Sequence, residues 1–474
     1  MALNSNAVPS RYSVYDLTVE KLCVIFTGAQ YQSWLDSEII GNLRTNYDLE
    51  IVILNSYFNF EGTLNFDYDT NLTSIHNLYL LNQLAQINLS KSFKFRLRRM
   101  FWGSINLFGQ NLSRLERIKA CFVVLRNLVG YSRKNYLQIF AFLHILRKFF
   151  EFYYKRKFKA ELVKLQKSEK NFIKNLDSSI IIFPTSGADL LAFELLALCK
   201  LERKNSIFVI ENWDNLTSKT TFPFNPDYIT VMGSKSVLQA QSIHGFLRKN
   251  IAITGLPRFE KYGESRRGMD SRFIKSSSKK ILYLGFSLPY NETRVVKAIL
   301  SHLQTNYSSS DFEMHYKPHP FRQKRFVEDI INIDEKADSA TIKIWDEKKH
   351  SHKYLPVIND DYLSFLSNFD IVITTPTTMA LEVMVLEIPC VIDSSDDGIH
   401  STSPWHAMNN YLHLEDLLEI PEVRIAKTEY EILVYLDELM KSKRPSQKYS
   451  IKDIVETQQK FSSNLIQFLK DMKV

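Results

Sequence analysis

The sequence predicts an α/β protein with two Rossmann-like domains that face a cleft. Three observations lead to this fold class. Residues 369–393 contain a buried apolar strand, a hydroxyl-rich turn, a helix and a second strand, which is the order of a βαβ unit with a parallel sheet. The same alternation of strands and helices occurs in both halves of the chain. A polar, basic stretch at 256–278 separates the halves and is typical of an interdomain linker.

Composition is typical of a globular protein and argues against several classes of function. The 474-residue chain has 45% hydrophobic residues and a mean hydropathy of −0.19, as soluble proteins with a buried core do. A net charge of +8 is too small to indicate nucleic-acid binding. The four cysteines lie far apart without a CxxC pair, which favours a reducing compartment and argues against zinc. Without a signal-peptide pattern or an apolar run of about 18 residues, we expect a cytosolic protein.

Residues 1–255 form the predicted first domain. Runs rich in β-branched and aromatic residues predict its strands, and runs of good helix formers between them predict its helices. The expected strands are 21–26, 49–55, 178–184, 205–211, 226–233 and 250–255, and the expected loop-and-helix segments include 185–203 and 234–246.

Residues 91–170 interrupt this alternation as a predicted helical insertion. The segment mixes basic and aromatic residues, for example Arg96 and Arg98 beside Phe93 and Phe95. An amphipathic helix of this composition suits the surface of an anionic membrane. It equally suits an insertion whose aromatic residues pack on the domain, because an amphipathic pattern does not identify what the apolar face contacts. The sequence leaves both interpretations open.

Residues 279–441 form the predicted second domain, and residues 442–474 form a C-terminal helical segment. The alternation of the first domain returns here, although the two halves share no visible sequence repeat. Strands are expected at 280–287, at the start of 312–320, and at 369–374 and 390–393, and helices at 379–387, 429–441 and about 452–472.

An anion-binding site is expected where two strands of the second domain end. Ligands of parallel sheets bind at the carboxyl ends of the strands, where loop amides and helix N-termini point outward. Four threonines lie in the stretch 374–378, at such a strand end. His319 follows another strand, between Lys317 and Arg322, and these cations favour an anionic ligand and lower the pKa of the histidine.

The Lys-Pro-His-Pro stretch at 317–320 and the later stretch at 374–382 resemble the nucleotide-binding half of GT-B glycosyltransferases of bacterial surface-polysaccharide assembly. Their motifs are similar to those of bacterial sialyltransferases, capsule polymerases and CDP-glycerol-type transferases. The resemblance implies a GT-B fold in which His319 and the paired hydroxyls bind the donor phosphate, while Glu382 holds the donor ribose. Glu387 stands where many GT-B proteins have glycine. The predicted donor-binding residues are Lys317, His319, Pro320, Arg322, Thr377, Thr378, Glu382, Gly285 and Ser287.

The loop that begins at residue 211 is the most unusual stretch of the first domain. It gathers more polar groups around one tryptophan than Asx turns and helix caps account for. This loop and the stretch at 255–262 resemble motifs of uncharacterised surface-carbohydrate glycosyltransferases. The residues expected to line the acceptor side of the cleft are Ser186, Gly187, Glu211, Asn212, Asn215 and Lys219.

Inverting sugar transfer needs a carboxylate base on the acceptor side, opposite the leaving phosphate. Asp189 and Asp214 are the candidates for this base, and His319 joins them as the third candidate catalytic residue. Asp189 begins a predicted helix, so a role as N-cap is its alternative.

No metal or separate cofactor is expected. The loop after residue 393 contains Asp396, Asp397, His400 and His406, but their spacing does not match a helical or hairpin ligand set. The expected enzyme is therefore metal-independent, and its donor is a nucleotide sugar linked to CMP, CDP or UDP.

The sequence therefore predicts an inverting glycosyltransferase that moves a sugar from a nucleotide-sugar donor to a growing glycan or lipid-linked glycan of capsule, O-antigen or lipopolysaccharide. We expect it on the inner face of the plasma membrane, with the anionic membrane surface as a partner and without nucleic acid. Its oligomeric state stays open. The alternatives are a CDP-glycerol or CDP-ribitol phosphotransferase of the same fold, a nucleotide-sugar 2-epimerase-like protein, and a noncatalytic assembly protein.

Overall fold

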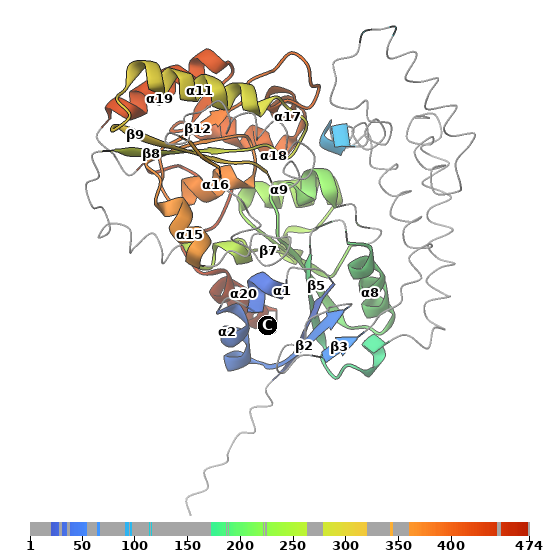
Figure 1. Cartoon of the computed structure of the whole chain (residues 1–474). Coiled ribbons are helices and arrows are strands. Elements are labelled where there is room, and N and C mark those ends of the chain that lie inside the picture. The colour runs from blue at the N-terminus through green and yellow to red at the C-terminus, as the bar shows by residue number, and fades with distance from the viewer. Residues whose placement is uncertain are drawn as a thin grey trace, which may run out of the picture.

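The computed structural model shows two α/β domains, one above the other in Figure 1, each built on a parallel sheet. Most of the predicted insertion at 91–170 and residues 263–277 of the predicted linker lie outside the residues that the structure describes. Those residues are 20–27, 31–35, 38–54, 64–66, 91–93, 95–96, 113, 115, 172–185, 187, 189–220, 222, 225–262, 278–319, 342–344, 360–442 and 447–472.

The first domain contains a sheet of seven described strands in which all neighbours are parallel. The strands are β1 (Lys21–Phe26), β2 (Asp48–Leu54), β3 (Leu64–Phe66), β4 (Ile180–Thr185), β5 (Asn205–Ile210), β6 (Tyr228–Val231) and β7 (Ile251–Ile253). Their order in space is β3-β2-β1-β4-β5-β6-β7, so the direction of winding reverses between β1 and β4. Such a reversal leaves a crevice at the carboxyl ends of the two strands.

Helices cover both faces of this sheet. They are α1 (Tyr31–Leu35), α2 (Ile39–Asn46), α8 (Leu190–Leu201), α9 (Ser234–His244) and α20 (Phe461–Asp471), with short turns η3 (Phe172–Asn175), η5 (Arg248–Asn250) and η6 (Pro257–Phe259). Within β1, Cys23 and Ile25 belong to the core under α8, whereas Leu22 and Val24 belong to the core under α2 and α20. Because successive side chains of a strand point to opposite faces, an uninterrupted apolar strand needs both layers.

The second domain repeats this architecture with six described strands. They are β8 (Lys279–Leu284), β9 (Phe312–Lys317), β10 (Ile342–Ile344), β11 (Ile371–Thr374), β12 (Cys390–Asp393) and β13 (Arg424–Ala426). All neighbours are parallel, in the order β10-β9-β8-β11-β12-β13. The winding reverses between β8 and β11, which places a second crevice at their carboxyl ends. The predicted α/β class with two Rossmann-like domains is confirmed.

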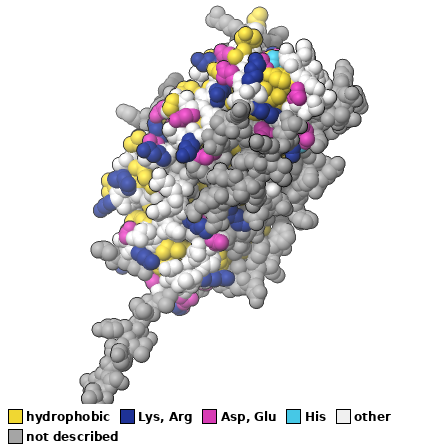
Figure 2. Space-filling model, turned by 90° about the vertical axis from the view of Figure 1, so that its left-hand side faces the viewer, with side chains coloured by type: hydrophobic (Ala, Val, Ile, Leu, Met, Phe, Trp, Pro, Cys, Tyr) yellow, Lys and Arg dark blue, Asp and Glu magenta, His cyan; other side chains and the backbone are white. Residues whose placement is uncertain are grey.

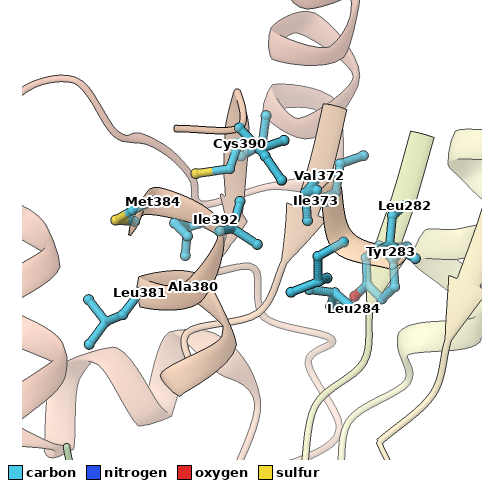
Figure 3. Close-up of a cluster of buried hydrophobic side chains, with 14 of the residues drawn as sticks. Leu282, Tyr283, Leu284, Val372, Ile373, Ala380, Leu381, Met384, Cys390 and Ile392 are labelled. Carbon is cyan, nitrogen blue, oxygen red and sulfur yellow. The ribbon is translucent and has the colours of Figure 1, made fainter. Parts of the chain in front are cut away.

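The helices of the second domain are α11 (Glu292–Asn306), α15 (Asp360–Ser367), α16 (Thr378–Val385), α17 (Pro404–Asn410), α18 (Leu412–Glu415) and α19 (Glu429–Lys441), with the turn η7 (Asp416–Glu419). Figure 1 shows α11 and α19 on one side of the sheet and α16 on the side toward the first domain. Figure 3 shows Leu381 and Met384 of α16 in the same apolar cluster as Val372 and Ile392 of the strands. The apolar face of α16 thus fixes the helix to the sheet.

Glu387 ends α16 in an unusual backbone conformation. Its φ of 56° lies in the left-handed region, which glycine adopts at many helix ends and other residues adopt rarely. The next strand, β12, begins at Cys390. The turn that many GT-B proteins form with glycine is therefore formed here by a glutamate.

The predicted helix at about 452–472 is wrong in its first half. Helix α20 begins at Phe461, and the residues before it contact the first domain as turns and irregular chain. The amide of Lys235 donates to the carbonyl of Asp453 (2.9 Å), and the amide of Glu456 donates to the carbonyl of Met232 (2.7 Å). These tertiary hydrogen bonds override the helix propensity of the segment.

The first residues of the predicted insertion pack between the two domains. Phe93 and Phe95 are buried, and the Phe95 ring meets Tyr411 of the second domain edge to face at 5.0 Å. Arg96 donates to the carbonyls of Ser218 (2.7 Å) and Lys219 (2.9 Å) in the first domain. This part of the insertion is therefore a packing element.

Two further observations concern a membrane. No helix among the described residues is long and apolar enough to cross one. On the face of the molecule shown in Figure 2, described Lys and Arg side chains are interspersed with Asp and Glu. Membrane binding by the insertion thus stays a prediction that depends on residues outside the described part.

Candidate functional site

The crevice of the second domain lies where β8, β9 and β11 end. The amide of Gly285, just after β8, donates to the carbonyl of Lys317 at the end of β9 (2.9 Å). A Cβ atom on Gly285 would lie 2.9 Å from the His319 amide nitrogen and 3.1 Å from Pro318 Cα. Glycine is therefore needed here so that the His-Pro loop can lie against the end of β8.

A buried glutamate fastens these two loops to each other. Glu292, in the first turn of α11, accepts the amide of Phe286 (2.7 Å) and the hydroxyl of Tyr316 (2.6 Å). Ser287 follows in the same fastened loop. Predicted donor residues Pro320 and Arg322 lie outside the described residues. The main chain up to His319 is thus held rigidly at the crevice.

Buried threonine hydroxyls lie between the end of β11 and the start of α16. Thr377 is the N-cap of α16 by its backbone, yet its hydroxyl makes no cap hydrogen bond. The Oγ1 atoms of Thr375 and Thr377 are buried without a hydrogen-bond partner among the described residues. A buried hydroxyl without a partner costs about 1–3 kcal/mol. The amides of Thr378 and Met379 precede the first hydrogen-bonded amide of α16, that of Ala380, which donates to the Thr377 carbonyl (3.0 Å). This arrangement can bind an anion.

Glu382 lies further along α16 and contacts the first domain. Its carboxylate is buried, pairs with Arg258 (Nη1 to Oε1, 3.2 Å) and accepts the hydroxyl of Tyr362 at Oε2 (3.0 Å). Arg258 also donates from Nη2 to Oδ1 of Asn212 (2.9 Å). Helix α16 therefore faces the first domain, and the predicted ribose contact of Glu382 stays a prediction beside this ion pair.

In the first-domain crevice, Asp189 has both carboxylate oxygens engaged. Oδ1 caps α8 by accepting the amides of Leu191 (3.0 Å) and Ala192 (3.2 Å), and Oδ2 accepts the hydroxyl of Thr27. Burial raises the pKa of this carboxyl against the effect of those hydrogen bonds. The geometry is that of an N-cap, the alternative that the sequence left open.

Gly187 and Asn215 form the floor below that crevice. Gly187 has a φ of 84°, and a Cβ atom there would lie 2.6 Å from Cγ of Asn215. The amide of Gly187 donates to the hydroxyl of Thr185 (3.1 Å), and the Asn215 amide group donates to the Thr185 carbonyl (3.4 Å). Asn215 is thus a buried scaffold residue. Ser186 lies outside the described residues.

The second candidate base, Asp214, is neutralised by a neighbour. Its carboxylate pairs with Lys219 at 2.8 Å. Burial alone would raise the pKa of Asp214, but the charges of Lys219 and Arg96 hold it below its usual value. A carboxylate with a lowered pKa is a weak base, so Asp214 is poorly suited to remove a proton.

The loop that holds Asp214 docks on the second domain. Its residues Asn215–Lys219 form one π-helical turn, η4. The hydroxyl of Thr217 is hydrogen-bonded to His413 (2.8 Å), and the Trp213 indole donates to Asp416 (3.4 Å). Burial lowers the pKa of His413 to about 4, so the imidazole is neutral in this contact. Several residues of the loop that begins at Glu211 therefore contact the second domain.

Glu211, at the end of β5, has a different environment from both aspartates. Its carboxyl is buried, and Oε1 accepts the indole N–H of Trp34 (2.7 Å). Burial raises its pKa to about 8, although the Trp34 hydrogen bond and the charge of Arg258 act in the opposite direction. Oε2 makes no hydrogen bond to the described residues. Of the three carboxyls, Glu211 is the one that neither caps a helix nor forms an ion pair among the described residues, and its pKa is raised to about 8.

Sequence reasoning singled out most of these positions but missed Arg258, Trp34 and Tyr362. Arg258 lies in the stretch 255–262, whose motif was a usable signal, since an arginine just after Gly-Leu-Pro is placed by a fixed turn. Nothing local marks Trp34 or Tyr362, because each contacts a residue far away in sequence.

The loop that follows β12 has a structural role, because it is hydrogen-bonded to the chain before α11. It contains Asp396, Asp397, His400 and His406. Asp397 accepts the amide of Asn291 (2.9 Å) and lies 2.5 Å from Nδ1 of His400, which joins this loop to the one before α11. Across the described part of the chain, no group of three or more His, Cys, Asp or Glu side chains is arranged to hold a metal ion.

Comparisons with known proteins identify the fold. No family model matches the chain, and no curated protein sequence matches it. The UDP-GlcNAc 2-epimerase of Methanocaldococcus jannaschii aligns with 95% of this chain and 99% of its own at 12% identity, with a TM-score of 0.51. At that identity the similarity shows a shared GT-B-like fold.

Two further solved structures align over a similar length. The UDP-GlcNAc 2-epimerase of Neisseria meningitidis covers 95% of this chain and 100% of its own, at 9% identity and a TM-score of 0.49. The lipopolysaccharide outer core galactosyltransferase WaaB covers 95% and 99%, at 10% identity and a TM-score of 0.41.

Proposed function

We propose that the protein is an inverting, metal-independent glycosyltransferase that uses a nucleotide-sugar donor and builds a cell-surface glycan. One observation carries the proposal. An unsatisfied anion site at the N-terminus of α16 and a carboxyl with a free oxygen, Glu211, lie on facing domains that Arg258 bridges. Sugar transfer needs these two features together, a cradle for the leaving phosphate and a base opposite it.

In the proposed reaction, Glu211 accepts the proton of an acceptor hydroxyl. The hydroxyl oxygen forms a bond to the anomeric carbon of the donor sugar, and the bond from that carbon to the phosphate oxygen breaks. The nucleotide leaves with the bonding electrons as additional negative charge. Thr375, Thr377 and the first amides of α16 bind that charge, and His319 donates a hydrogen bond to it.

Glu211 replaces Asp189 and Asp214 as the proposed base because its surroundings suit the role better. Asp189 holds the end of a helix with one oxygen and Thr27 with the other. Asp214 is paired with Lys219. A pKa of about 8 lets Glu211 accept a proton near neutral pH and release it again.

A nucleotide-sugar 2-epimerase activity is the second candidate, favoured by the shared fold with the UDP-GlcNAc 2-epimerase of Methanocaldococcus jannaschii. An epimerase would act on the donor alone. A transferase, or a polyol-phosphate transferase with the same cradle, would need an acceptor. The reaction partner therefore separates the candidates.

The test begins with a thermal-shift screen of CMP, CDP, UDP and GDP and their sugar and glycerol conjugates. A ligand at 100 times its Kd stabilises the protein by about 2.7 kcal/mol, which is readily seen. The stabilising donor is then incubated with and without a membrane glycolipid extract. Sugar incorporated into the extract supports the proposal, whereas epimerisation of the donor without extract supports the second candidate. A screen in which no nucleotide stabilises the protein contradicts both.

A further inference from the structure

The stretch 255–262 has no part in the reaction above, yet it is fastened to several elements. Gly255 has a φ of 80°, and a Cβ atom there would lie 2.6 Å from the carbonyl oxygen of Glu456 on the returning chain. Glu260 is buried and accepts both the amide (3.0 Å) and the hydroxyl of Ser462 at the start of α20. The backbone that carries Arg258 is therefore fixed where the chain crosses between the domains.

Arg258 extends from this fixed backbone to both domains. One guanidinium nitrogen contacts Glu382 of the second domain (3.2 Å), and another contacts Asn212 of the first (2.9 Å). These two contacts use two of the five N–H donors of the guanidinium, and the side chain is 27% exposed. A single cation thus joins the anion-binding helix to the loop that begins at Glu211.

Glu382 needs this cation. Its side chain is 2% exposed, and Tyr362 already donates to its second oxygen. A buried carboxylate without a counterion is strongly unfavourable, so Arg258 balances a charge that has no access to water. The negative charge of Glu382 therefore cancels part of the positive field of Arg258.

The positive charge of Arg258 also acts on Glu211 and favours its ionised form. Among the described residues, Arg258 is the charged group that acts on this carboxyl, and the uncharged indole of Trp34 faces it from α1. Trp34 is immobilised between Phe26 (5.8 Å between ring centres) and Phe461 (5.5 Å). Glu211 therefore has one rigid, uncharged partner, Trp34, and is influenced by one cation, Arg258, which also pairs with Glu382.

We propose that Arg258 is a positioning residue that couples the ionisation of Glu211 in the first domain to the state of Glu382 in the second. The proposal rests on the proposed role of Glu211 as base. A ligand at the N-terminus of α16 that displaces this helix lengthens the contact between Glu382 and Arg258, so that the negative charge of Glu382 cancels less of the field of Arg258 at Glu211. Occupation of the second-domain site thereby favours the form of Glu211 that accepts a proton.

The test is a pH titration of tryptophan fluorescence in the full-length protein without ligand. The indole of Trp34 donates to Glu211, so protonation of the carboxyl changes its emission. The transition belonging to this pair is the one that disappears in both Glu211→Gln and Trp34→Phe. Arg258→Met removes the cation and should move the transition to higher pH. Glu382→Gln frees the cation and should move it down.

Opposite shifts are the signature of the coupling, because general loosening of the interface would move both variants in the same direction. Arg258→Lys keeps the charge without the two-domain geometry, and its transition should lie between those of the wild type and Arg258→Met. If Arg258→Met does not fold, the Lys and Gln variants still give shifts of opposite sign. An unmoved transition, or shifts of one sign, overturns the proposal.

This titration needs neither donor nor acceptor, so it separates the coupling from the reaction. Opposite shifts in a protein that transfers no sugar would support the coupling and refute the proposed function. Sugar transfer with an unmoved transition would support the function and refute the coupling. If both hold, the alkaline shift in Arg258→Met appears again in the pH profile of kcat/KM.

Discussion

The two crevices of the molecule share a topology and differ in the hydrogen bonds of the threonines at their strand ends. Between β1 and β4, the hydroxyl of Thr27 is bonded to Asp189, and the amide of Gly187 is bonded to Thr185. Between β8 and β11, the buried hydroxyls of Thr375 and Thr377 have no partner in the described part of the chain. Since both sheets are parallel and reverse at equivalent places, the side chains create the difference.

This difference has a consequence for the role of each crevice. Polar groups that satisfy one another stabilise a scaffold, as Thr27 and Asp189 do at the start of α8, although Oδ1 of Asn215 and Oγ1 of Thr220 are also buried without a partner among the described residues. Polar groups left unsatisfied reduce stability by about 1–3 kcal/mol each, which a protein tolerates at a site where a ligand restores the hydrogen bonds. The unpaired threonine hydroxyls of the second crevice are therefore in keeping with the proposed binding of a ligand there.

The largest expected effect separates the three carboxyls of the first crevice. Glu211→Gln should lower kcat by roughly two to four orders of magnitude while donor binding persists, because the proton acceptor is lost. Asp189→Asn should keep most activity, since asparagine is as good an N-cap as aspartate. In the wild type, kcat/KM should rise with pH through about 8, where Glu211 loses its proton. Steady-state kinetics across a range of pH measure the kcat of both variants and the pH profile of the wild type. A normal turnover in Glu211→Gln, or a collapse in Asp189→Asn, would return the role to Asp189.

The glycines of the two crevices should respond differently to an added methyl group. Gly187→Ala forces a residue with a side chain into a positive φ and against Asn215, so we expect a loss of about 2–4 kcal/mol in unfolding free energy. Gly285→Ala should cost about 1–3 kcal/mol and displace His319, so that donor affinity falls as well. Denaturant unfolding and donor titration of both variants test this. Equal donor affinity in the two variants would contradict the assignment of the second crevice.

The pH dependence of stability should also identify Glu211. Its pKa is raised from 4.5 in the unfolded chain to about 8 in the fold, so the folded state binds the proton more tightly. The stability from this group is complete below pH 4.5 and is lost as the pH rises through about 8. Glu211→Gln carries no such loss, and its stability relative to the wild type should increase by about 1 kcal/mol or more between pH 5 and pH 9. Urea denaturation at several pH values measures the difference. A constant difference would mean that the carboxyl titrates normally.

Removing a single threonine hydroxyl should change the unfolding free energy of the ligand-free protein by a smaller amount, and the change should differ between the two crevices. Thr27→Val deletes a hydroxyl that bonds to Asp189 and should cost about 1 kcal/mol or more of unfolding free energy. Thr375→Val deletes a buried hydroxyl without a partner and should be neutral or slightly stabilising. Calorimetric melting of the two matched variants compares them directly. A destabilised Thr375→Val would show that this hydroxyl already has a structural role.

The smallest expected effect concerns the predicted membrane partner. The protein should co-sediment with anionic vesicles at low salt and be partly released at high salt, since each basic residue near such a surface contributes about 1 kcal/mol. Arg98→Glu should weaken this binding without lowering activity on a soluble acceptor. Arg96→Glu should destabilise the protein as well, because Arg96 holds two carbonyls of the first domain. No sedimentation at low salt would leave the insertion with a packing role.

Local sequence patterns predicted the elements whose determinants are local. Helix α19 has its predicted bounds because Thr428 caps it by accepting the amide of Glu431 (3.2 Å). The buried strands were evident from their uninterrupted apolar runs. The start of α20 was missed because hydrogen bonds to Met232, just after β6, and to Lys235 of α9, both far away in sequence, determine the path of the chain around residue 455.

The same limit applies to the site. The His-Pro and threonine stretches could be placed because they follow strands, and strand ends of a parallel sheet meet at one edge. Arg258 could not be placed, since its partners Asn212 and Glu382 lie 46 and 124 residues away in the chain. Whether Asp189 caps a helix or acts as a base depends on Thr27, 162 residues earlier.

The second crevice should bind the nucleotide through hydroxyls that the free protein leaves unsatisfied. Calorimetric titration with the nucleotide that performs best in the screen tests it in the wild type, in Thr375→Val, in Thr377→Val and in Thr27→Val. Loss of a hydrogen bond to a charged phosphate costs about 1.5–3 kcal/mol, so Kd should rise roughly 10-fold to 150-fold in the two second-domain variants. Thr27→Val should bind as the wild type does. Equal affinities in all four proteins would contradict the account.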